Sequence, residues 1–287
     1  MPYTNYNQVL QDLADNIREV NGSTAPIRFV DMPDLIDAFI SPSISLYGES
    51  GSTWKRKLIP YIGDTSGMTD MHNMFKDLDQ RNYPLDLSQF DTSNVTNMSH
   101  MFDRTFVSSL DLSSFDTSNV TDISYMFSEL WVSTSEDLDL SHFNTSKVTN
   151  MRYTFFNLGY PSTASVTLDV TGWDVSKVTD FTGCFAVDPY HTFSGIGITE
   201  LDLSDWDTSK ASAMNNMFGG TYLRKIWVPS TFVATRCPSN SKPFGVQPRN
   251  TCHIYTDASS ASAQGWGSIV SPFTVHYNST HADYENA

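Results

Sequence analysis

Aspartates recur at the same position of successive repeats in the middle of the chain. Carboxylates arranged in this way could bind metal ions or take part in catalysis. Five aligned segments each place one Asp between two apolar residues; these are Asp86, Asp111, Asp139, Asp169 and Asp202. A second, partial column contains Asp64, Asp91, Asp116, Asp174 and Asp207, with Asn144 in place of one member. If the segments stack as parallel strands about 4.8 Å apart, the first column forms a ladder of carboxylates.

Two interpretations of this carboxylate ladder compete. The carboxylates could be solvated groups that accept backbone N–H bonds in turns, or they could hold calcium between successive segments, which requires about six to eight oxygen ligands. The chain has no twelve-residue calcium loop and no glycine-rich nonapeptide, the two sequence patterns typical of such sites. The sequence therefore favours turn caps and predicts neither a metal site nor a cofactor.

The evidence for catalysis is weak. Acidic pairs such as Glu136-Asp137 are easy to find in an acidic chain, but nothing selects one pair as a glycosidase acid and base. The seven histidines show no HExxH spacing, and neither a G-x-S-x-G motif nor a phosphate-binding glycine loop is present. We therefore expect a protein that is not an enzyme.

Composition narrows the class of partner. The 287 residues carry a formal net charge of −15, which repels nucleic-acid backbones and anionic membrane surfaces. No stretch approaches the roughly 18 apolar residues of a membrane span, and the first residues lack the pattern of a secretory signal. The three cysteines, Cys184, Cys237 and Cys252, are too few for a disulfide framework, although Cys237 and Cys252 could pair.

Internal repeats decide the expected architecture. Residues 85–102 read LDLSQFDTSNVTNMSHMF, and four later segments align with them without gaps. In each copy an alternating apolar pattern such as Leu85-Asp86-Leu87 predicts a short strand. Apolar residues spaced like Val95, Met98, Met101 and Phe102 predict a short helix. A unit this small cannot bury its own apolar face, so neighbouring copies must stack.

The repeat motif resembles the bacterial surface-protein repeat of the BspA-like leucine-rich-repeat class. The resemblance covers about residues 58–230 and implies an α/β repeat fold. We expect a leucine-rich-repeat-like solenoid of about seven strand-turn-helix rungs. The aromatic columns of the repeat, such as Phe90, Phe115 and Trp173, are expected to fill its core.

The two ends of the chain differ from the repeats. Residues 1–40 contain an apolar stripe on one helix face, Tyr6, Leu10, Leu13 and Ile17, and resemble a segment common in phage tail and fibre proteins. We expect this helical segment to anchor or oligomerise the protein, with a trimer favoured; the alternative is an ordinary helical cap. Residues 41–57 are expected to be a connector and residues 231–287 a C-terminal cap.

The loops that return from one repeat to the next vary in length while the repeat itself is nearly constant. Insertions of this kind lie on one side of a solenoid and often form its binding face. The aromatic or heteroaromatic residues in these loops are Phe106, Trp131, Tyr160, Tyr190, His191 and Phe193. We expect them to bind a receptor, although some of them could instead fold back over the core.

The two resemblances and the missing signal together favour a phage virion fibre or tail-tip protein that binds a glycan or protein on the host surface. Its expected location is the virion, assembled in the bacterial cytoplasm, with other virion proteins as partners through the N-terminus. The first alternative is an adhesin of the BspA-like class on a bacterial cell surface. The second alternative is a fibre-borne glycan depolymerase.

Overall fold

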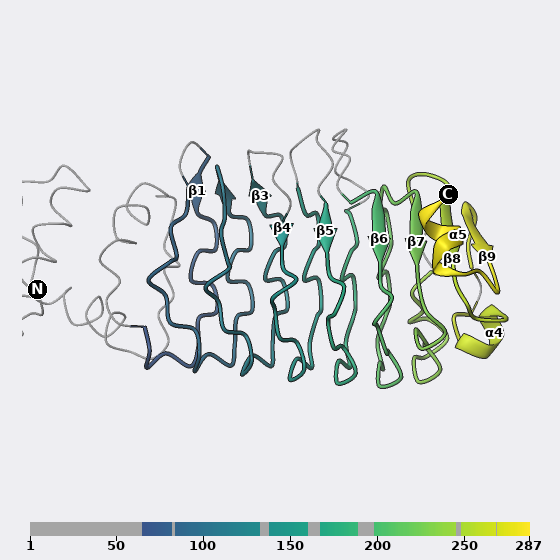
Figure 1. Ribbon diagram of the computed structural model, residues 1–287, viewed down its shortest axis with the longest axis horizontal. Coiled ribbons are helices and arrows are strands. Elements are labelled where there is room, and N and C mark those ends of the chain that lie inside the picture. Colours follow the sequence, from purple (N-terminus) through teal and green to yellow (C-terminus); the bar gives the residue numbers. More distant parts are fainter. Residues whose placement is uncertain are drawn as a thin grey trace, which may run out of the picture.

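A computed structural model of the chain describes residues 65–81, 84–132, 138–159, 167–188, 198–244, 248–267 and 269–287. The predicted N-terminal segment, residues 1–40, and the connector, residues 41–57, lie outside these residues. The described part is a parallel β-solenoid of about six turns, in which successive repeats lie side by side along one axis (Figure 1). None of its helices is long and apolar enough to cross a membrane.

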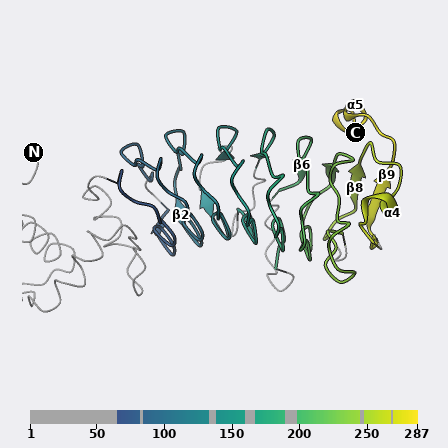
Figure 2. The ribbon, with the colours of Figure 1, turned by 90° about the horizontal axis from the view of Figure 1, so that it is seen from below.

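The strands are short and pair in parallel, but only those near residues 138, 168 and 201 fall on the predicted alternating segments. Leu85 and Leu110 form a single bridge, and the strands of the first sheet lie where return loops were expected. One sheet contains β1 (Asp79–Gln80), β2 (Phe106–Val107) and β3 (Trp131–Val132). A second contains β4 (Leu138–Asp139) and β5 (Leu168–Asp169). The third contains β6 (Glu200–Asp202), β7 (Lys225–Trp227), β8 (Cys252–Tyr255) and β9 (Phe273–His276), in chain order. Figure 2 shows the same succession of turns from a second side.

The predicted helix of each repeat is not formed in the described residues of the solenoid, and this part of the prediction was wrong. Within residues 95–102, Asn97 forms a single bridge and residues 99–102 form a turn instead. The amide of Met101 donates to the carbonyl of Met98, three residues back, while the amides of His100 and Phe102 donate to the next turn of the solenoid, to Ser124 and Met126. An α-helix would direct each of these amides four residues back along the chain. A turn closed by a bond three residues back also places every third side chain toward the core. It therefore gives the same spacing of apolar residues that predicted a helix.

These stacked turns continue as a ladder of single parallel bridges. The bridged residues are Asp70, Asn97, Asp122, Asn150, Asp180 and Ala213. They mark six turns of the solenoid in the described chain, whereas about seven rungs were expected. The half-copy at the end of the array contributes β7, the second strand of the C-terminal sheet.

Most turns of the solenoid contain two residues with a left-handed backbone, four positions apart, and the first of these positions is left-handed in all six turns. The residues at this position have φ between +54° and +60°; they are Asn73, His100, Tyr125, Tyr153, Gly183 and Asn216. Asn and Gly adopt this conformation at low cost, whereas Tyr does so rarely. The packing of neighbouring turns therefore imposes the left-handed backbone, even at residues such as Tyr125 that disfavour it.

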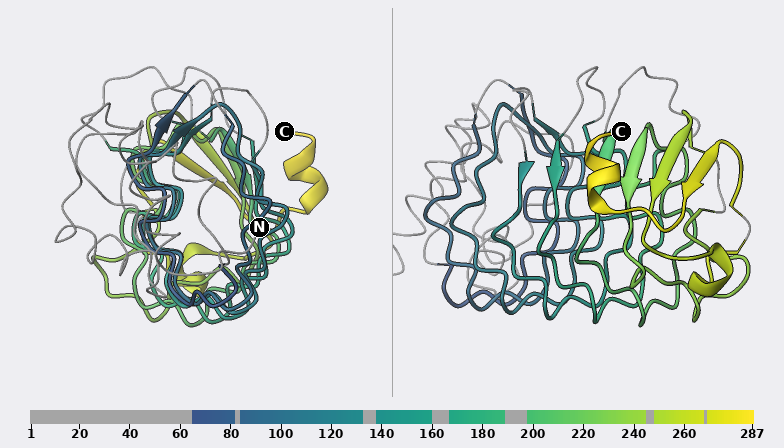
Figure 3. Two further views of the ribbon diagram at one scale, coloured as in Figure 1. Left: turned by 90° about the vertical axis from the view of Figure 1, so that its left-hand side faces the viewer. Right: turned by 45° about the vertical axis from the view of Figure 1, so that its right-hand side comes forward.

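The core is a single apolar cluster enclosed by the chain turns, which overlie one another when viewed along the stack (Figure 3). One column of rings contains Phe75, Phe102, Phe127, Phe155, Phe185, Phe218 and Phe244, with neighbouring ring centres 5.2–5.9 Å apart. The predicted core residues Phe115 and Trp173 are buried as well. The indole of Trp173 donates to the Leu140 carbonyl of the preceding turn at 3.0 Å, so even the polar atom of this ring is paired.

Buried threonine hydroxyls join successive turns. The hydroxyl of Thr92 donates to the Asp116 carbonyl at 3.0 Å and accepts a bond from the Asp116 amide at 2.8 Å. Thr65 and Thr117 make the same pair of bonds one turn before and one turn after. These bonds satisfy backbone groups at a corner where no regular strand pairing exists.

The C-terminal cap extends the solenoid. Strands β8 and β9 agree with the prediction for residues 252–256 and 273–277. Helix α4 (Ala261–Gln264) begins after the N-cap Ser260, and helix α5 (His281–Glu285) lies outside the ring of the solenoid (Figure 3). Cys184, Cys237 and Cys252 are free and buried, and burial raises the pKa of each thiol.

Candidate recognition surface

Two of the predicted receptor-binding aromatics become neighbours in the first sheet. Phe106 on β2 is paired in register with Trp131 on β3, and their ring centres lie 6.3 Å apart. The next residue of each strand, Val107 or Val132, packs against the core. Because successive side chains of a strand point to opposite faces, Phe106 and Trp131 lie on the outer face, where both are half-buried.

An arginine that the sequence analysis did not single out joins these rings. The guanidinium of Arg81 lies 4.5 Å from the ring centre of Phe106 and 5.9 Å from that of Trp131. Its Nε atom is 3.4 Å from a carboxylate oxygen of Asp79. Arg81 directly follows the end of β1, so the parallel stacking of β1 on β2 brings it to Phe106. We call Asp79, Arg81, Phe106 and Trp131 the aromatic–arginine surface.

The aromatic–arginine surface combines three kinds of chemical group. It offers flat apolar area, a cation and a carboxylate within one patch. Aromatic and Arg side chains are the types that contribute most binding energy where a partner buries them. The ring faces are suited to apolar faces of sugars or side chains, and the charged groups to polar atoms.

A second aromatic column was also missed. The rings of His100 and Tyr125 stack with centres 4.4 Å apart, and the ring of Tyr153 lies tilted by 36° against that of Tyr125 with centres 4.9 Å apart. All three residues occupy the first left-handed position of the repeat, so the sequence alignment itself contained the signal. These rings cover one another's faces, which leaves mainly their edges for a partner.

The carboxylate ladder serves the turns. The carboxylate of Asp86 accepts bonds from the amide and hydroxyl of Ser88, and that of Asp139 accepts the same two bonds from Ser141. Bonds from the serine two residues on lower the pKa of Asp86, Asp111 and Asp139. In the described ranges, no three His, Cys, Asp or Glu side chains are grouped to hold a metal ion. The geometry agrees with turn caps.

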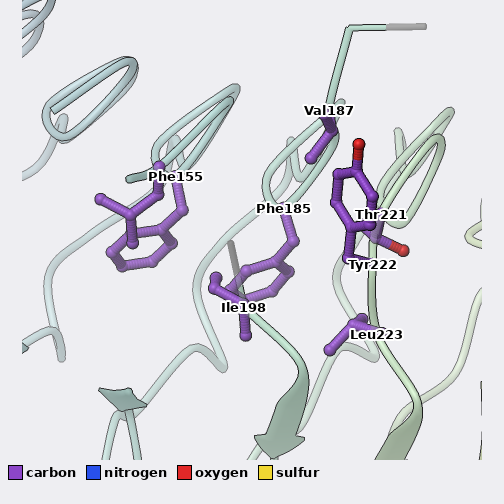
Figure 4. A pocket seen from close by; sticks show the side chains of 8 residues that line it. Phe155, Phe185, Val187, Ile198, Thr221, Tyr222 and Leu223 are labelled. Carbon is purple, nitrogen blue, oxygen red and sulfur yellow. The ribbon is translucent and has the colours of Figure 1, made fainter. Parts of the chain in front are cut away.

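A small apolar cavity lies between side chains of successive turns of the solenoid (Figure 4). Its lining residues are Phe155, Leu158, Phe185, Val187, Ile198, Thr221, Tyr222 and Leu223. Its volume is about 10 Å³, which is no more than one water molecule occupies. The cavity is therefore too small to bind a substrate or cofactor.

The other predicted site residues cannot be placed. The loop residues Tyr160, Tyr190, His191 and Phe193 lie outside the described residues, as do the predicted oligomerisation residues Tyr6, Leu10, Leu13 and Ile17. Their roles stay predictions.

The repeats match one protein family. The family described as "Mycoplasma protein of unknown function, DUF285" matches residues 59–163 and 160–223, more than half of the chain. The chain belongs to the DUF285 family. The DUF285 match covers the segment that resembles BspA-like surface repeats, and it does not extend to residues 1–40, where the phage resemblance lies. No curated protein and no solved structure matches the chain.

Proposed function

We propose that this DUF285 protein is a non-enzymatic recognition protein that binds a glycan or protein on a cell surface. The observation that supports this most directly is the aromatic–arginine surface. Three residue types that are enriched at binding interfaces, Phe, Trp and Arg, lie together on the outer face of a rigid sheet. The stacked core fixes their positions before a partner arrives, which lowers the entropic cost of binding.

We further propose that the protein acts as an adhesin on a bacterial surface. The DUF285 match and the BspA-like repeat motif support this setting, because both fall on the solenoid. A phage fibre or tail-tip protein is the second candidate, supported by the N-terminal segment, residues 1–40. In that setting the segment would attach a homotrimer to other virion proteins, and the solenoid would contact the host.

The binding proposal is tested on a glycan array and on intact bacterial and host cells. Trp131→Ala and Arg81→Ala should each weaken binding by about tenfold or more, the effect of removing a hot-spot side chain. Tyr277→Ala is the matched control, because Tyr277 is an exposed aromatic side chain in the C-terminal cap. Circular dichroism of each variant checks the fold. Equal binding by all three variants would reject the surface as the binding site.

Immunogold labelling with antibodies against the solenoid tests whether the protein lies on a bacterial surface or on a phage particle. Label on the outside of the producing cells supports the adhesin, whereas label on the tails of purified virions supports the fibre protein. The neighbouring genes give an independent test, because a tail operon is expected for the fibre protein alone.

A further inference from the structure

Two histidines of the C-terminal sheet face each other. His253 lies on β8 and His276 on β9, the last strand of the solenoid (Figure 3, right). The Nδ1 atom of His253 is 2.9 Å from the Nε2 atom of His276. Ile254, which follows His253 on β8, is fully buried in the core. The two half-buried imidazoles therefore lie on the outer face of the sheet, where solutes can reach them.

The neighbouring side chains hold the pair in place. The ring of Tyr255 stacks on that of His276, with centres 4.5 Å apart and an angle of 6° between the planes. Tyr255 and His276 are also partners in the register of β8 and β9. Ring orientation is thus set by the sheet and by stacking, so little side-chain entropy remains to be lost when a ligand binds.

We propose that His253 and His276 bind a divalent transition-metal ion such as Cu²⁺, Ni²⁺ or Zn²⁺. Neutral imidazole nitrogens are preferred ligands of these ions, whereas Ca²⁺ and Mg²⁺ prefer oxygen. Two metal–nitrogen bonds of about 2.0–2.1 Å at a tetrahedral angle place the nitrogens about 3.3 Å apart. The observed 2.9 Å contact is a hydrogen bond between the two rings, so an ion would replace it. The shared proton would leave to solvent, and both rings would turn until their nitrogen lone pairs point at the ion.

The charges around the pair permit a cation. Lys225 is the register neighbour of His253 on β7, but its ammonium lies 3.4 Å from the Glu200 carboxylate on β6 and 4.8 Å from the ring centre of Tyr284. These contacts direct the Lys225 charge away from β9. The net charge of −15 also attracts cations to the protein as a whole.

The proposed site is open on its outer side. Since no grouping of three or more His, Cys, Asp or Glu ligands occurs in the described part of the chain, water would complete the coordination. An ion bound to both histidines would connect β8 to β9, the strand that ends the sheet. Binding to the folded state alone would raise the thermal stability of the protein.

The experiment is a calorimetric titration of the full chain, free of any affinity tag, with Cu²⁺ and with Zn²⁺. We expect one equivalent to bind, and we expect His253→Gln and His276→Gln each to weaken binding by about tenfold or more. His72→Gln is the matched control, because His72 has a carboxylate neighbour, Asp70 at 2.8 Å, but is not part of the histidine pair. It should bind like the wild type.

Two further measurements distinguish this site from general surface binding. The electron paramagnetic resonance spectrum of the Cu²⁺ complex should show two coordinated nitrogens, and Zn²⁺ should raise the melting temperature of the wild type but not of His276→Gln. The proposal is overturned if the wild type binds no ion, or if both histidine-pair variants bind as tightly as the wild type does.

Discussion

At the scale of single residues, the first left-handed position of the repeat carries the most informative side chains. In two neighbouring turns this position holds Tyr153, with φ +54°, and then Gly183, with φ +60°. A Cβ atom added to Gly183 would lie 2.1 Å from Cε1 of Tyr153. The ring of Tyr153 therefore occupies the space that a side chain at position 183 would need, and only glycine fits there.

We predict that Gly183→Ala destabilises the protein by more than Gly172→Ala does. Gly172 has φ +77°, but a Cβ atom there would meet no atom within 4 Å, so this control isolates the cost of the left-handed backbone to an L-residue, about 1–2 kcal/mol. At Gly183 the Tyr153 ring must also move, which disturbs its packing against Tyr125. Urea unfolding measures both variants, and the additional loss should shrink in a Tyr153→Ala background. Equal losses at the two glycines would contradict the steric explanation.

At the scale of elements, each solenoid turn is held to the next mainly at its corners. The strands are only two to four residues long, too short for ladder bonds alone to join the turns. Side chains supply the missing hydrogen bonds. Buried threonine hydroxyls bond to the backbone of the next turn, and Asp or Asn side chains at the corners accept bonds from the backbone amide two residues on. In one turn the threonine position holds Val175, so the fold tolerates one interruption of this column.

We predict that Thr92→Val costs about 1–3 kcal/mol of unfolding free energy, because it removes both bonds to the backbone of Asp116 inside the protein. Thr96→Val is the control. Thr96 also bonds to a backbone carbonyl, that of Thr69 at 3.0 Å, but it is exposed, so water replaces the lost bond and the change should stay within about 0.5 kcal/mol. Similar losses in both variants would mean that water also reaches the Thr92 corner.

At the scale of the whole molecule, the acidic surface makes stability depend on pH. Many aspartates accept bonds in turns, and the pKa of Asp86, Asp111 and Asp139 is lowered in the folded state. A carboxyl whose folded pKa lies below its unfolded value of about 3.9 stabilises the fold above that value, and this contribution is lost as the pH falls through the folded pKa. The protein should therefore lose stability progressively below about pH 4.

We predict that replacing Asp86, Asp111 and Asp139 together by Asn flattens this dependence. Asn accepts the same amide bond, as Asn144 does from Ser146, but it does not titrate in this range. Urea unfolding at pH 7, 4 and 3 provides the measurement. If the triple variant loses as much stability between pH 7 and pH 3 as the wild type does, these turns are not the source of the acid sensitivity.

The oligomeric state is a further property of the whole molecule. We predict that the full chain self-associates through residues 1–40, because the stripe Tyr6, Leu10, Leu13 and Ile17 gives an apolar helix face. Light scattering should give a multiple of the monomer mass for the full chain and the monomer mass for residues 41–287. Monomer masses for both would refute the prediction.

The sequence by itself determined the repeat, the stacked aromatic core and the parallel strands β4, β5 and β6, because those features depend on side-chain types that recur in register. It did not indicate β1, β2 and β3, which lie in the segments expected to be loops. It could not distinguish a helix from stacked turns over residues 95–102, since both place apolar residues three and four positions apart. Only the tertiary structure decided this, through amides such as that of His100 that bond to the next turn. Likewise, Arg81 meets Phe106, and His253 meets His276, across more than twenty residues of chain. Both contacts depend on how each turn is aligned with the next. The sequence does not reveal that alignment, because the loops between turns differ in length.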